Sequence, residues 1–153
     1  MIQADRRLAF EVIAAFRSRS NPVDSIRVID RWDDENCLLA EFSTPVPLPF
    51  GKPRTLKTVE YVTFHEPSRI EFELAEPNGI LHILQDRFIL EDADGWTRFR
   101  YESRFGLSGW MFGWLLGKLV ISGMFRRHMR THVTALKETI EARAVRSRRF
   151  PAP

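Results

Sequence analysis

The middle of the chain alternates apolar and polar residues, from residue 25 to residue 105. The clearest stretch places Ile70, Phe72 and Leu74 on either side of Glu71 and Glu73. Successive side chains of a β-strand point to opposite faces of a sheet, so this pattern predicts a strand with one buried face. The same criterion predicts six strands, at Ser25–Trp32, Cys37–Thr44, Arg54–Phe64, Arg69–Ala75, Ile80–Glu91 and Trp96–Phe105.

Short turn-forming segments separate most of these strands, at residues 33–36, 66–68, 76–79 and 92–95. Connections of this length favour antiparallel neighbours, so the strands are expected to form a meander. Residues 45–53 contain four prolines and are expected to form a loop, because proline cannot donate to a β-ladder.

In a meander the connections alternate between the two ends of the sheet, so residues 45–53, 76–79 and 106–109 are expected at one end. That end carries an apolar rim, made of Val46, Leu48, Phe50, Leu107 and Trp110. Such a rim suits the opening of an apolar binding site. The same side chains could instead close the end of the hydrophobic core.

Helical spacing replaces alternation at the two ends of the chain. Asp5 is placed to cap a short helix from Arg6 to about Phe16. A long helix is expected from Ser108 to about Ala144, and its second half has one apolar stripe, of Phe125, Met129, Val133, Leu136 and Ile140. Its first half has glycine at positions 109, 113 and 117, which leaves one line of the helix without side chains. We expect both that a curved sheet wraps this helix and that the gap between them holds an apolar ligand.

The global composition suits one domain, because the chain has 153 residues. We expect residues 1–144 to form this domain and residues 145–153 to form a basic, flexible tail. The single cysteine, Cys37, cannot form an internal disulfide, and the charged residues from Asp5 to Arg7 stand where a signal peptide would be apolar. Both features favour a cytoplasmic location for the protein. The oligomeric state stays open.

Basic residues gather near the C-terminus. Residues 126–149 hold eight Lys or Arg against Glu138 and Glu141, in a chain of net charge +3. A solvated helix face explains them, and contact with an anionic membrane surface is the alternative; we expect no nucleic-acid partner. Residues 108–125 carry only one charge, Lys118, but glycines and serines dilute their hydrophobicity, so docking at a membrane surface is favoured over spanning it.

The strand expected at Ile80–Glu91 carries candidate chemistry. If Phe88 and Leu90 face the helix, alternation also places His82, Leu84 and Asp86 on that face. Thr97, Phe99, Tyr101 and Ser103 would lie beside them on the next strand. Buried polar groups are costly unless they are paired, so His82, Asp86 and Tyr101 either satisfy one another, reach solvent, or contact a ligand. Glu60 is a weaker candidate, since its strand has apolar residues on both faces.

No sequence motif indicates a metal or a cofactor. His128 and His132 lie four residues apart on the expected helix, but Met129 stands where a metalloprotease has its catalytic glutamate. The chain also has no nucleophile elbow, phosphate-binding loop or dinucleotide fingerprint. We therefore expect no bound metal and no cofactor.

Four segments resemble a known superfamily: IQADRRLAFEVI, TVEYVTFHEPSRIEFELAEPNG, FILEDADGWTRFRYES and RRHMRTHVTALKETIE. Together with the order of elements they resemble the START and birch-pollen-allergen superfamily, also called SRPBCC or polyketide cyclase/dehydrase proteins. The resemblance implies an α+β helix-grip fold, in which a curved antiparallel sheet of six or seven strands wraps a long C-terminal helix beneath a short N-terminal lid helix. Members usually begin with a longer strand than Met1–Ala4 allows.

The glycine line, the apolar rim and the resemblance together predict that the protein binds a lipid, isoprenoid or polyketide-like molecule between sheet and helix. The residues expected to contact it are His82, Leu84, Phe99, Tyr101, Ser103, Trp110, Met111, Trp114, Leu48 and Phe50. One alternative is a cyclase or aromatase that uses His82, Asp86 or Tyr101 for proton transfer. Another is a module that binds a protein partner or a membrane surface. The fold itself does not choose among them.

Overall fold

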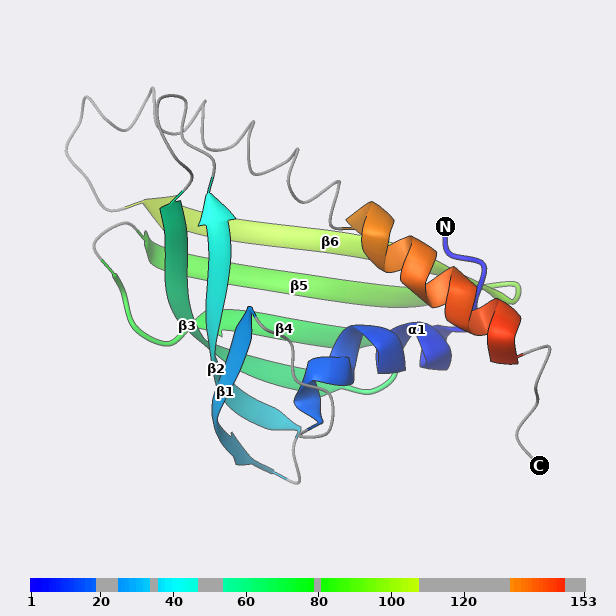
Figure 1. The fold of residues 1–153 in the computed structure, drawn as a ribbon, viewed down its shortest axis with the longest axis horizontal. Helices are drawn as coiled ribbons and strands as arrows, with labels where there is room; N and C mark the ends of the chain where they lie inside the picture. Colours follow the sequence, from blue (N-terminus) through cyan, green and yellow to red (C-terminus); the bar gives the residue numbers. More distant parts are fainter. Residues whose placement is uncertain (19–24, 34–35, 47–53, 79–80, 108–132, 148–153) are drawn as a thin grey trace.

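A single antiparallel sheet organises the molecule in the computed structural model, which describes residues 1–18, 25–33, 36–46, 54–78, 81–107 and 133–147. Its strands are β1 (Ile26–Trp32), β2 (Cys37–Val46), β3 (Arg54–His65), β4 (Arg69–Leu74), β5 (Leu81–Ala93) and β6 (Trp96–Leu107). Each strand pairs with the next in sequence order, so the expected meander is confirmed. The sheet is curved and twisted, and β2 and β3 cross the direction of β5 and β6 (Figure 1).

Both helical segments lie on the same face of this sheet (Figure 1). They are α1 (Arg6–Ile13) with its 3₁₀ continuation (Ala14–Arg17), and the helix of residues 133–147. We call the face that they cover the inner face and the opposite face the outer face. This arrangement of curved sheet, C-terminal helix and short N-terminal helix confirms the expected helix-grip fold. None of the helices among the described residues is long and apolar enough to cross a membrane.

The first helix begins where the sequence predicted. A carboxylate oxygen of Asp5 accepts a hydrogen bond from the backbone N–H of Leu8 at 2.9 Å, which satisfies one of the free donors of the first turn. Ala9, Phe10 and Ile13 are buried against the sheet. The expected single helix up to Phe16 instead tightens into a 3₁₀ turn after Ile13.

The C-terminal helix runs to residue 147, three residues beyond the expected end at Ala144. Ile140 and Ala144 are buried, and Leu136 packs against the same core as Phe10 and Leu38. This part of the expected apolar stripe therefore faces the sheet. Phe125 and Met129 lie outside the described residues.

The start of the chain is attached to the last strand by one β-bridge. The backbone N–H of Ile2 donates to the carbonyl of Thr97 at 2.8 Å, and the N–H of Thr97 donates back at 3.0 Å. The hydroxyl of Thr97, which is completely buried, also donates to the carbonyl of Ala4 at 2.8 Å. The residues before α1 therefore contribute a bridge and not a full strand.

One expected loop boundary was wrong, because β2 continues through Pro45 and Val46, which pair with the first residues of β3. The N–H of Ser43 donates to the carbonyl of Ser25, in the direction of β1. Alternate residues of a strand point their backbone groups to the same side, so the nitrogen of Pro45 also points toward the β1 side. The β1–β2 ladder has ended by then, and the missing N–H costs no bond to β3.

Candidate functional site

Two carboxyl groups lie on the inner face, beyond the part of the sheet that packs against α1. Residues paired across antiparallel strands point to the same face. Glu60 pairs with Ala40, which belongs to the core, and Asp86 pairs with Phe72 and Ser103. Both acids are therefore directed toward the helices and not toward the outer solvent.

The carboxyl group of Asp86 has two hydroxyl groups near it, those of Ser103 and Tyr101. Ser103 is directly opposite it on β6, and Tyr101 is one pair further along, opposite Phe88. Burial raises the pKa of Asp86 above its usual range, and the nearby hydroxyls of Ser103 and Tyr101 oppose that rise without cancelling it. Among the described residues, the Oδ1 atom of Asp86 and the Oη atom of Tyr101 are buried without a hydrogen-bond partner. Neither atom reaches standard hydrogen-bond geometry, although the hydroxyls of Tyr101 and Ser103 lie close enough to Asp86 to lower its pKa.

The phenol of Tyr101 keeps its proton at neutral pH. Burial first, and then the neighbouring charge of Asp86, raise the pKa of Tyr101 above its usual value. The group can therefore donate a hydrogen bond as well as accept one.

Glu60 is the more deeply buried acid, with 6% of its surface exposed. Its carboxylate accepts a hydrogen bond from the hydroxyl of Thr58 at 2.5 Å. The net pKa of Glu60 is raised to about 7. Burial is the main cause, the hydrogen bond from Thr58 opposes the rise, and the charge of Asp86 adds to it. A carboxyl group with this pKa can both give up and take up a proton near neutral pH.

Aromatic rings extend from this polar cluster across the inner face. Phe88 lies 5.0 Å from Phe72, 5.4 Å from Phe99 and 5.6 Å from Tyr101, measured between ring centroids. Phe42 continues the row, 5.8 Å from Phe72. Of these rings Phe72 is buried, whereas Phe42, Phe88 and Phe99 are partly buried. The row therefore offers apolar surface next to the unsatisfied polar atoms.

His82 does not share the inner face with Asp86, contrary to the expected alternation. The β5–β6 pairing shifts between Leu81 and Ile83, and this bulge adds one residue to β5. Leu81 is consequently buried, while the exposed His82 ring lies beside Gly106, 2.7 Å from where a Cβ on that glycine would stand. Gly106 is two residues from Arg104 and three from Ser103, so this is the outer side of β6.

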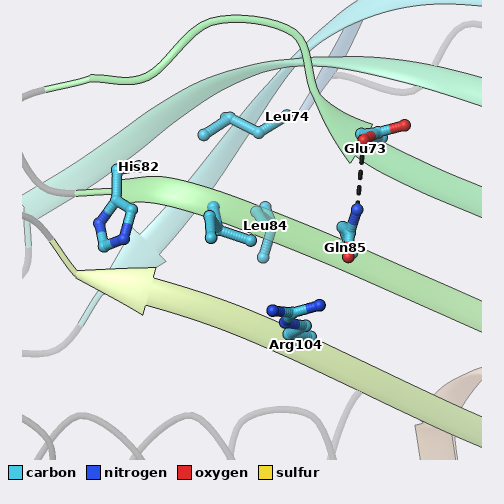
Figure 2. Close-up of a pocket in the computed structure, with 7 residues that line it drawn as sticks. Glu73, Leu74, His82, Leu84, Gln85 and Arg104 are labelled. Atoms are coloured by element: carbon cyan, nitrogen blue, oxygen red, sulfur yellow. Dashed lines mark hydrogen bonds between the residues drawn. The ribbon is translucent and has the colours of Figure 1, made fainter.

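A shallow hollow of about 160 Å³ lies next to His82 (Figure 2). It opens where the β4–β5 pairing ends, at Glu73 and Gln85, whose side chains form a 3.2 Å hydrogen bond. The residues around it are Glu73, Leu74, His82, Ile83, Leu84, Gln85 and Arg104. Sites for drug-sized ligands usually enclose about 300–1,000 Å³, so this hollow is not the expected apolar cavity.

The remaining site residues of the sequence prediction divide into two groups. Asp86, Leu84, Phe99, Tyr101 and Ser103 lie on the inner face, on the two neighbouring strands where they were expected. Outside the described residues lie Leu48, Phe50, Trp110, Met111, Trp114, His128, His132 and the glycine line. Their contribution to a ligand site stays a prediction.

Sequence reasoning undervalued Glu60, because apolar residues occur on both faces of β3. Val59 and Tyr61 on the outer face are as hydrophobic as Val62 on the inner face. The signal that places Glu60 inside is its cross-strand partner, Ala40, within a β2 segment whose inner residues are apolar. This pairing can be known only once the register between β2 and β3 is known.

Comparison with known proteins identifies the fold. No family model and no curated protein matches the chain. TTHA0849 from Thermus thermophilus has a similar structure, with a TM-score of 0.73 and 17% sequence identity over 94% of each chain. The fold is a helix grip.

Two further structures with this fold are described as aromatase/cyclases. The Zhui aromatase/cyclase from Streptomyces sp. R1128 gives a TM-score of 0.74 at 12% identity, over 93% of this chain and 90% of that one. The di-domain ARO/CYC BexL from the BE-7585A biosynthetic pathway gives 0.64 at 16% identity, over 99% of this chain and 48% of BexL. The chain thus spans about half of the di-domain protein. At these identities the likeness establishes the fold alone.

Proposed function

We propose that the protein binds a hydrophobic or amphipathic small molecule on the inner face, between the sheet and the C-terminal helix. The observation that carries this proposal is the pair of buried, unpartnered polar atoms, Asp86 Oδ1 and Tyr101 Oη, beside partly buried phenylalanines. A buried polar group without a partner costs about 1–3 kcal/mol. A ligand that bonds to both atoms removes that cost while its apolar part covers the rings.

The aromatic row gives such a ligand its affinity. Each Å² of apolar surface removed from water contributes about 25 cal/mol, and the exposed parts of Phe42, Phe88 and Phe99 are available for it. Ring pairs at these separations also favour edge-to-face or tilted contact with a further aromatic group. The binding energy is therefore apolar, and the polar pair orients the ligand.

A cyclase-like enzyme is the second candidate, and Glu60 favours it. A carboxyl group with a pKa of about 7 is suited to general acid–base catalysis at neutral pH. Asp86 and Tyr101 lie on the same face and could bond to a carbonyl or enol group of the substrate. The aromatase/cyclase descriptions of two similar structures are consistent with this candidate. His82 lies on the outer side, away from these groups.

Native mass spectrometry of protein purified gently from cells tests ligand binding. We expect extra mass on the folded protein, released on denaturation, and lost from a Phe88→Ala variant that remains folded. A matched control is Tyr61→Ala, which removes an exposed aromatic side chain from the outer face of β3. If wild-type protein never carries or takes up an apolar molecule, the proposal is wrong and a protein-binding module becomes the better interpretation.

The choice between carrier and enzyme needs a turnover measurement once a ligand is known. In the enzyme, Glu60→Gln or Asp86→Asn lowers turnover and leaves ligand affinity within a few-fold. In the carrier, the ligand leaves the wild-type protein chemically unchanged. Identifying the released molecule by mass before and after incubation separates the two results.

A further inference from the structure

The ring of Phe16 comes from the first helical segment of the chain but covers part of the aromatic row. Its centroid lies 5.7 Å from that of Phe64, 6.1 Å from that of Phe42 and 6.5 Å from that of Phe72. The planes of Phe16 and Phe72 are inclined by 26°, so the two rings are stacked. A side chain that does not belong to the sheet therefore closes the row over Phe72, which is 8% exposed.

The 3₁₀ turn that follows α1 explains why Phe16 points toward the sheet. Side chains three residues apart lie in line along a 3₁₀ helix, and Ile13, three residues before Phe16, is buried. The next residue, Arg17, fastens the turn: its guanidinium pairs with Glu66 at 3.6 Å, and its carbonyl accepts from the Arg31 side chain at 3.4 Å. These contacts hold the Phe16 ring on the inner face.

The row is partly exposed on both sides of the point that Phe16 covers. Phe88 on β5 lies 5.0 Å from Phe72, and Phe42 on β2 lies 5.8 Å from Phe72. Both Phe88 and Phe42 are only partly buried, whereas Phe16 is 9% exposed. A ligand that lies on Phe88 and Phe99 and extends toward Phe42 therefore meets the Phe16 ring.

We propose that Phe16 determines how long a ligand the inner face accepts, because its ring divides the aromatic row between Phe88 and Phe42. The inference rests on the proposed ligand-binding function and deepens it, since it makes the site one for compact apolar molecules and not for long chains. The geometry supports it, because the ring covers Phe72, the neighbour of both partly buried rings. A smaller side chain at this position would join the two parts of the row into one longer apolar surface.

Ligands that differ only in length test the inference: 4-ethyl-, 4-butyl-, 4-hexyl- and 4-octylphenol, each titrated by calorimetry. In wild type the affinity should rise about fourfold for each methylene group added, up to a limiting chain length, and then stop rising. Phe16→Ala removes the ring, so its limit should lie about two to four methylene groups further out. Phe16→Trp carries a larger ring and should reach its limit at a shorter chain.

Two further variants keep the test decisive where alanine or tryptophan disturbs folding. Phe16→Leu loses less apolar volume than Phe16→Ala, and its limit should move outward by a smaller amount. Phe10→Leu is the matched control, because Phe10 lies on α1 and is buried in the core with 1% of its surface exposed. It should lower stability and leave the limiting chain length unchanged.

The same limit in wild type, Phe16→Leu and Phe16→Trp overturns the inference while ligand binding stands. An affinity that still rises at 4-octylphenol in wild type also overturns it. So does an equal outward shift in Phe10→Leu, because any loosening of the core would then lengthen the site. If no alkylphenol binds to wild type and nothing co-purifies with it, the proposed function itself fails, and the inference fails with it.

Discussion

The hydroxyl of Thr58 donates to the carboxylate of Glu60 two residues further along β3, at 2.5 Å. Residues two apart on a strand share a face, so this bond lies within the buried inner surface. It is the only compensation for the burial of Glu60 that the described residues provide by hydrogen bonding, and it favours the ionised form. The balance between burial and this bond makes Glu60 sensitive to pH in the physiological range.

Stability should fall as the pH rises through the range in which Glu60 ionises. The pKa of Glu60 is about 7 in the folded protein against 4.5 for an ordinary glutamate, so the folded state holds the proton more tightly. Its contribution to stability is fully present below about pH 4.5 and is lost as the pH rises through about 7. The difference between these two pKa values corresponds to about 3 kcal/mol.

Urea unfolding of wild type and Glu60→Gln across this pH range measures the effect. The variant should gain about 3 kcal/mol relative to wild type between low and high pH, since glutamine does not ionise. Asp86 titrates in both proteins, and its electrostatic coupling to Glu60 is part of the measured difference. Parallel stability curves for the two proteins would contradict the assigned pKa.

Thr58→Val should raise the pKa of Glu60 above its present value. Valine has the shape of threonine but no hydroxyl, so the ionised carboxylate loses its bond and the protonated form is favoured. The carboxyl carbon resonance of Glu60, followed by NMR against pH, reports the change. Thr55→Val, at an exposed position of the same strand, is the control and should leave that titration unmoved.

Gly106→Ala should destabilise the protein, by about 1 kcal/mol, because the new methyl group meets the His82 ring at 2.7 Å. The ring is the far end of an exposed side chain and can move, so the cost is modest. His82→Ala should remove most of that cost, which a double-mutant cycle of unfolding free energies measures. An additive cycle would mean that the bulge does not place His82 over Gly106.

Asp5→Ala should cost about 1 kcal/mol of stability through loss of the helix cap. Glu11→Gln serves as the comparison, because its ion pair with Arg7 lies at the surface of the same helix and contributes little. Thermal unfolding of both variants gives the measurement. Equally small effects would show that the Asp5 side chain does not stabilise α1 as a cap.

The pattern of the chain predicted the strands and turns well, because alternation and turn chemistry are local. In β4 the alternation of apolar and acidic residues is enough to assign Ile70 and Phe72 to one face and Glu71 to the other, with no knowledge of the partner strand. Asp5 identified the start of α1 for the same reason. The location of Asp86, Tyr101 and Ser103 on one face followed from counting along two regular strands.

Assigning faces from alternate residues failed where the pairing with a neighbouring strand decides which face a residue occupies. One added residue at the β5 bulge moves His82 to the outer side, and a count of alternate residues along a single strand cannot anticipate it. Glu60 was undervalued for a related reason, since only its pairing with Ala40 shows which face of β3 is buried.

The sequence by itself determined the six strands, their meander and the polar residues available on β5 and β6, since each depends on a few neighbouring residues. The tertiary structure alone decided which acids lie together: it brings Glu60 within electrostatic reach of Asp86 and leaves Asp86 and Tyr101 with unpartnered atoms. The physical reason is that register, bulges and burial are properties of paired strands and packed faces, and no single strand encodes them.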